Sequence, residues 1–177
     1  MGLFYENLDE RTRRLMLDEM EVDAASDRLH ISPYLSGQGA HDYPSLLRRA
    51  IESGSDDSLA EALSQQRRIE RAAPRRASDE GFSLVAVPSN AAQVLAESEF
   101  NRYYIRALAR RALEDGITEL VVFRAKPVEH PRPESEALVE TTFDPQAILD
   151  DLRARSGELP SLAVPAGPGS GLSVRLP

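Results

Sequence analysis

The sequence contains no cysteine, no tryptophan and a single lysine, Lys126. Without cysteine, the chain forms no disulfide and offers no thiol nucleophile and no cysteine-ligated metal or cluster. No run of apolar residues approaches the ~20 that a bilayer-spanning helix needs, and the opening residues MGLFYENLDERTRR lack the basic-then-apolar order of a signal peptide. We therefore expect a protein of the cytoplasm, or of an assembly built there, that does not cross a membrane.

Positively charged residues are fewer than negatively charged ones: 21 Lys and Arg against 29 Asp and Glu give a formal net charge of −8. This balance argues against bulk attraction to nucleic acid or to anionic membranes. The distribution is uneven, since residues 67–76 hold five arginines against one glutamate. Codon bias of a high-GC genome explains the preference for arginine most simply; selection for bidentate arginine contacts is the alternative.

The first part of the chain, residues 1–73, reads as a helical region. Helix caps and apolar periodicity predict helices over about 9–23, 44–53 and 56–73, the second beginning at Asp42-Tyr43-Pro44. Residues 74–81 combine proline, small residues and mixed charge, which indicates a linker. We place the domain boundary there.

The stretch after the linker has the most consistent local signals of the chain. A short apolar run over 82–87 predicts a buried strand, a helix is predicted over 90–115, and β-branched residues predict a strand over 117–125. Asn90 supplies a cap and Gly116 a stop signal. A β-α-β unit of this kind has parallel strands joined by a right-handed crossover.

Three further elements complete the predicted C-terminal domain, residues 82–177. They are a strand over 137–143, a helix that starts at Asp144-Pro145, and a strand over 172–176. The order β-α-β-β-α-β is that of a ferredoxin-like sandwich, so the fold class is α+β. The sequence leaves open whether 137–143 pairs as a strand.

The long helix carries two rows of residues at a spacing of four. The apolar row consists of Phe100, Tyr104, Leu108 and Ala112. The arginine row consists of Arg102, Arg106 and Arg110, with Arg111 beside it. We expect the first row to be buried and the arginine row to face outward as an interface. Three interpretations stay open: a solvated face held by acids such as Glu99 and Glu114, ion pairing with an acid-rich region of this or another chain, and a nucleic-acid contact.

Residues that could carry chemistry are few. His30, His41 and His130 fall in predicted loops without the spacing of metal ligands. The segment GPGSG at 167–171 is followed by neither lysine nor a helix start, so it does not fit a P-loop. The acids of the loop 131–140 are not accompanied by a second motif that could form a site with them. We predict no catalytic residue, no cofactor and no metal.

At FNRYYIRALARRALEDG, VFRAKPVEHPRPESE and GPGSGLSVRLP the chain resembles small uncharacterised proteins of arginine-rich actinobacterial genomes and their phages. The resemblance spans most of residues 84–176 and carries no known catalytic motif. It implies a component of a phage particle or of a mobile element.

The sequence favours a non-enzymatic structural or adaptor subunit of a larger protein assembly, such as a virion, with protein partners or self-assembly. The alternative is a nucleic-acid-associated or regulatory protein. Its contacts would be Arg67, Arg68, Arg71, Arg75 and Arg76. An enzyme is the third hypothesis, and it predicts a closed pocket that joins His41, His130 and acids of the 132–140 loop.

Overall fold

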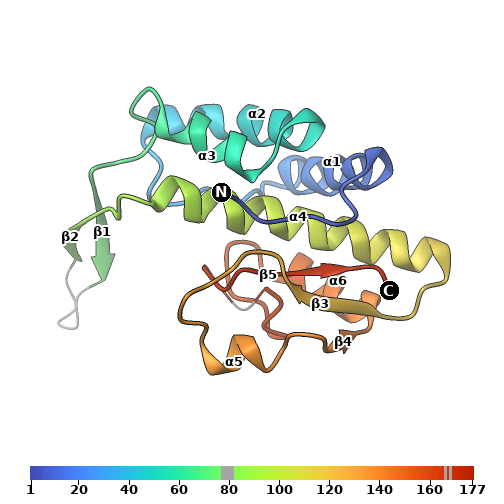
Figure 1. Cartoon of the computed structure of the whole chain (residues 1–177). Helices are drawn as coiled ribbons and strands as arrows, with labels where there is room; N and C mark the ends of the chain where they lie inside the picture. The colour runs from blue at the N-terminus through green and yellow to red at the C-terminus, as the bar shows by residue number, and fades with distance from the viewer. Residues whose placement is uncertain (77–81, 166, 168) are drawn as a thin grey trace.

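A computed structural model describes residues 1–76, 82–165, 167 and 169–177 (Figure 1). Its centre is helix α4 (Ala91–Asp115), with helices α1, α2 and α3 on one side and a small sheet and α6 on the other. The other elements are α1 (Glu10–Ala25), α2 (Gly37–Ser53), α3 (Asp56–Ser64), β1 (Ala72–Arg76), β2 (Phe82–Ala86), β3 (Leu120–Arg124), α5 (Pro133–Glu136), β4 (Thr142–Phe143), α6 (Pro145–Ala154) and β5 (Leu172–Arg175). The architecture is therefore α+β.

Helix α4 confirms the helix predicted over 90–115. Gly116 ends it in the left-handed conformation at φ 71°, and its N–H points back to the carbonyls of Ala112 and Leu113. Because elements pack on both sides of α4, the buried surface extends around most of the helix and includes the whole apolar row. Among the described residues, no helix is long and apolar enough to span a bilayer.

Helix α2 begins earlier than the sequence predicts. Ser36 caps it by accepting a hydrogen bond from the Gly39 N–H at 3.0 Å, so Pro44 lies inside the helix and not at its first turn. A Cβ on Gly39 would come 2.1 Å from the carbonyl oxygen of Arg68. The sequence-based prediction placed the start of the helix at Pro44. It did not take account of Gly39, whose lack of a side chain allows the chain after α3 to pass close to the first turn of α2.

The strands do not pair as predicted. β2 is antiparallel to β1 in a two-stranded sheet, and β3 is the middle strand of a separate antiparallel sheet in the order β4-β3-β5. The parallel β-α-β unit is thus wrong for the described strands, and the ferredoxin-like order is not confirmed. Buried side chains hold β5 on α4, because the Ser173 hydroxyl donates to Asn101 Oδ1 at 2.6 Å and Asn101 Nδ2 donates to Leu172 O at 2.9 Å.

The predicted linker, 74–81, contains the end of a strand. Residues 74–76 belong to β1, and 77–81 lie outside the described residues. The buried strand expected over 82–87 is largely exposed, because β2 projects from the body with β1 (Figure 1). The strand over 137–143 is reduced to the two residues of β4.

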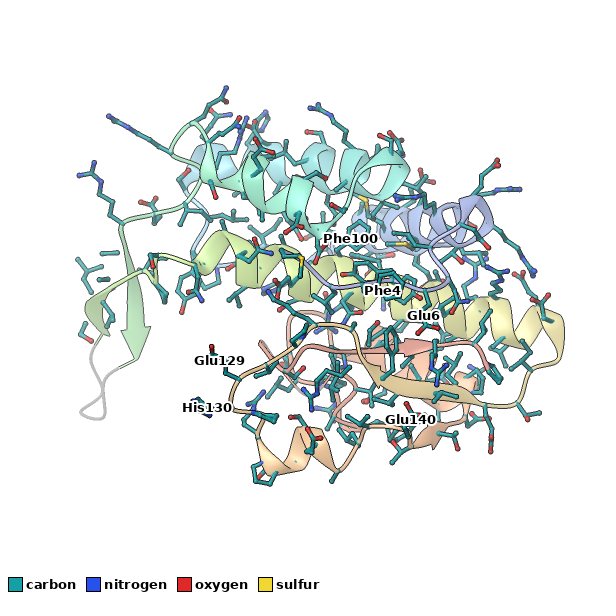
Figure 2. All side chains as sticks on the ribbon, in the orientation of Figure 1. Phe4, Glu6, Phe100, Glu129, His130 and Glu140 are labelled. Carbon is teal, nitrogen blue, oxygen red and sulfur yellow. The ribbon has the colours of Figure 1, made fainter. Side chains whose placement is uncertain are left out.

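One hydrophobic core joins the N-terminal helices to the sheet side of α4. It contains Met16 and Leu47 as well as Ile148 and Val174. The N-terminal segment also bridges the two sides, because the Phe4 N–H donates to Ala125 O at 2.8 Å. Figure 2 shows Phe4 beside α4.

Candidate functional site

The predicted arginine row does not face outward. Arg106 is only 1% exposed and is among the largest fully buried side chains of the protein. Its guanidinium donates to Glu19 Oε2 at 2.7 and 2.9 Å and to the carboxylate of Asp23. The outward orientation was predicted wrongly because α1 lies along this side of α4 and its acids at positions 19 and 23 match the arginine spacing.

Arg153, which is 40% exposed, completes an otherwise buried charge cluster, which we define as Glu19, Asp23, Arg106 and Arg153. Arg153 Nε donates to Glu19 Oε2 at 3.0 Å, and the Tyr103 hydroxyl donates to Asp23 at 3.1 Å. Burial alone would raise the pKa of Glu19, but hydrogen bonds and charge from Arg153 and Arg106 outweigh it and lower that pKa. The cluster therefore holds the Glu19 carboxylate ionised and joins α1, α4 and α6.

The other arginines of the row also bond within the chain. Arg102 donates to the carbonyl oxygens of Arg155 and Glu158, both at 2.7 Å. Arg110 pairs with Asp18 and Glu19 at 3.3 Å, and Arg111 pairs with Asp9 at 2.6 Å. Of the three interpretations of the row, the structure shows ion pairing with an acid-rich region of the same chain. Arg102 and Arg106 are too buried to contact a second chain.

The basic segment 67–76 is not a uniform patch. Arg68 is anchored, because its guanidinium pairs with Asp42 at 2.9 Å and donates to Ala62 O. Arg67 and Arg71 are exposed. Arg75 and Arg76 lie in β1, and their side chains are outside the described part of the structure.

The exposed feature with the clearest interaction chemistry is a hairpin arm, which we define as β1 and β2. Its strands are in register from Ala72 opposite Ala86 to Arg76 opposite Phe82, and it projects beyond the N-terminal end of α4 (Figure 1). On β2, Leu84 is 78% exposed and Val85 is 40% exposed. Each strand of this two-stranded sheet leaves one edge unpaired, so the arm presents free backbone hydrogen-bonding groups next to apolar side chains.

A cavity of about 290 Å³ lies beside the N-terminal half of α4. Its walls come from α4, from the connection before α2 and from the segment 157–172. His30 and Gly171 are among the lining residues, whereas His41 and His130 are not. Figure 2 shows His130 on the loop between β3 and α5. The pocket expected of an enzyme, joining His41, His130 and loop acids, is not this cavity.

Two titratable groups of the cavity wall are perturbed by burial. Glu99 is 4% exposed, and desolvation raises its pKa to about 7 against the opposing charge of Arg102. Burial and the charge of Arg102 lower the pKa of His30. The sequence predicted Glu99 beside the arginine row and no P-loop at 167–171. No local signal indicated that Glu99 lines one cavity with Gly167, Gly169, Ser170 and Gly171. Within the described residues, no three side chains are arranged to hold a metal ion.

Comparison of the chain with models of protein families, with curated proteins and with solved structures finds no match. The resemblance to actinobacterial and phage proteins over 84–176 therefore stays a prediction. Functional inference rests on the exposed arm and on the cavity.

Proposed function

We propose that the protein is a non-enzymatic structural or adaptor subunit of a larger protein assembly, and that the hairpin arm makes the contact. The observation that carries this proposal is the exposure of Leu84, at 78%, on a projecting strand with a free edge. A virion assembled in the cytoplasm is the assembly that the resemblance over 84–176 implies.

A two-stranded hairpin such as this arm is marginally stable in water by itself. Proteins usually protect free strand edges with charge, bulges or covering elements. On β2, the described side chains from Ser83 to Ala86 are uncharged, and two of them are large and apolar. Strand addition to the edge of another chain's sheet would pair the backbone groups and bury Leu84 and Val85. The arm is thus suited to bind protein.

Replacing Leu84 with lysine tests the arm. We expect the unmodified protein to form a dimer, or a complex with the product of a neighbouring gene, and Leu84→Lys to weaken association at least tenfold because a lysine charge would have to be desolvated. Size-exclusion chromatography with light scattering measures both. Measuring the protein alone and then mixed with the product of the neighbouring gene distinguishes a second copy from a different protein as the partner.

Leu113→Lys is the matched control, because Leu113 is exposed on α4 far along the helix from the arm. It should leave association unchanged. A stable monomer that binds none of the neighbouring gene products, or equal effects of the two substitutions, would contradict the proposal.

Exposed arginines at the base of the arm favour nucleic acid as a second candidate partner. Arg67 and Arg71 have accessible side chains just before β1. If both contact phosphates, replacing both with glutamine lowers the salt slope of duplex DNA binding by about 2, because each phosphate contact contributes about 0.9. Gel retardation at several salt concentrations gives the slope. Arg14→Gln, on exposed α1 surface, is the control, and absence of retardation at low salt removes this candidate.

A further inference from the structure

The cavity beside α4 contains a buried carboxyl group whose partner is missing from the described part of the chain. Glu99 is 4% exposed, yet no hydrogen bond or ion pair involving its side chain is found among the described residues. Its neighbour Arg102 has both terminal nitrogens bonded to the carbonyls of Arg155 and Glu158, and its Nε is buried without an acceptor. The Glu99 oxygens are not among the fully enclosed atoms that lack a partner, so the carboxyl has hydrogen-bonding capacity left for a ligand in the cavity that it lines.

The charges around the cavity favour a cationic partner. Glu97, Glu99 and Glu158 contribute acids to the wall, and Arg102 is the basic residue among them. Lys126 neutralises Glu97 from outside the lining. Arg102 is held by main-chain carbonyls, and Glu158 is exposed beside Arg155 at 3.9 Å, so the carboxyl of Glu99 is the buried acid left to pair with a cationic ligand.

The rest of the lining is suited to an apolar body. Aliphatic and proline side chains from α4 and from the segment 157–172 surround the space. They include Val94, Leu95, Leu159, Pro160, Pro165 and Leu172. A volume of about 290 Å³ lies at the lower end of the range for small-molecule sites. Such a site has mainly apolar walls with a few polar groups that fix the ligand's orientation.

We propose that this cavity binds a small primary amine with an apolar body, whose ammonium group pairs with the carboxylate of Glu99. The ammonium would supply the partner that Glu99 lacks, and the hydrocarbon part would fill the space between α4 and 157–172. This site is separate from the hairpin arm, so it adds a ligand to the proposed assembly role without depending on it.

Binding of an amine should also displace a proton from Glu99 at slightly acidic pH, because a carboxylate next to an ammonium ion is held ionised. The groups that face Glu99 are Tyr43 from α2, Asp23 from α1, and Arg102, Tyr103 and Arg106 from α4. His30 also lines the cavity, so the loss of proton release in Glu99→Gln is what assigns the released proton to Glu99.

Phenethylamine is the probe that tests the proposal. Isothermal titration calorimetry at pH 6, in two buffers of different ionisation enthalpy, should show binding with release of up to one proton. 2-Phenylethanol, which has the same shape without the charge, should bind at least tenfold more weakly. Glu99→Gln should lose at least tenfold affinity for phenethylamine and all of the proton release.

Glu158→Gln is the matched control, since it removes an acid from the same wall at an exposed position. It should change affinity less than threefold. Circular dichroism of Glu99→Gln checks that the variant is folded, and Leu84→Lys should bind the probe as the unmodified protein does. Equal affinity in Glu99→Gln, tighter binding of phenylacetate than of phenethylamine, or no phenethylamine binding up to millimolar concentration would overturn the proposal.

Discussion

Replacing Arg106 with methionine is expected to lower the free energy of unfolding by about 3–5 kcal/mol, the usual cost of removing one partner from a buried ion pair. Arg106 is 1% exposed, and it bonds to Glu19 and Asp23, which are equally buried. Methionine fills much of the same volume, so the loss comes from the charge and not from a cavity. Glu19 keeps Arg153, whereas the described partners left to the Asp23 carboxylate are the hydroxyl of Tyr103 and the guanidinium of Arg28 at 3.5 Å.

Urea unfolding followed by circular dichroism measures this loss. Arg110→Met is the matched control: it lies one turn further along the same helix, but its side chain is 26% exposed and its ion pairs are 3.3 Å long. Partly exposed pairs of this kind contribute at most about 1 kcal/mol. Similar losses in the two variants would show that the buried cluster does not stabilise the fold as described.

Replacing Glu99 with glutamine is expected to change the pH dependence of stability. The pKa of Glu99 is raised from its ordinary value of 4.5 to about 7, mainly by burial. The folded state therefore binds this proton more tightly than the unfolded state. Stability from the neutral carboxyl is fully present below pH 4.5 and is lost as the pH rises through about 7. At about 1.4 kcal/mol per pH unit, the full loss is about 3.5 kcal/mol, of which about 3 falls between pH 4.5 and pH 8.

Glutamine keeps the shape of the neutral acid and does not ionise, so Glu99→Gln should gain about 3 kcal/mol relative to the unmodified protein between pH 4.5 and pH 8. Urea unfolding of both proteins at pH 4.5, 6, 7 and 8 gives this difference directly. Glu10→Gln on exposed α1 surface controls for the lost net charge. A difference that is the same at every pH would contradict the raised pKa.

The elements that could be predicted from the sequence are those with local signals. Helices α1 and α6 begin at the predicted capping residues, and α4 ends at Gly116 as predicted, although Asn90 makes no side-chain capping bond at its start. Asp9 accepts from Thr12 N at 2.9 Å, and Asp144 accepts from Ala147 N at 2.8 Å. Such bonds join residues three apart, so spacing alone reveals them.

Pairing between distant segments could not be predicted in the same way. The apolar run at β2 is compatible with a buried strand or an exposed arm, and only its neighbours in space decide between them. The same holds for the arginine row. A spacing of four residues indicates one face of a helix, but it does not indicate whether that face is exposed to solvent. The sequence does contain one relevant signal: Glu19 and Asp23 are also four residues apart on α1, so their spacing matches that of the arginine row.

The charge cluster also sets an order of events during synthesis. Glu19 meets Arg106, which follows 87 residues later, and Arg153, which follows 134 residues later. At ~5–20 residues per second, α1 waits on the order of ten seconds for its last partner. We expect its acids to stay hydrated during that time, because burying an unpaired carboxylate is costly. Helix α1 would then pack against α4 only after its arginine partners have been made.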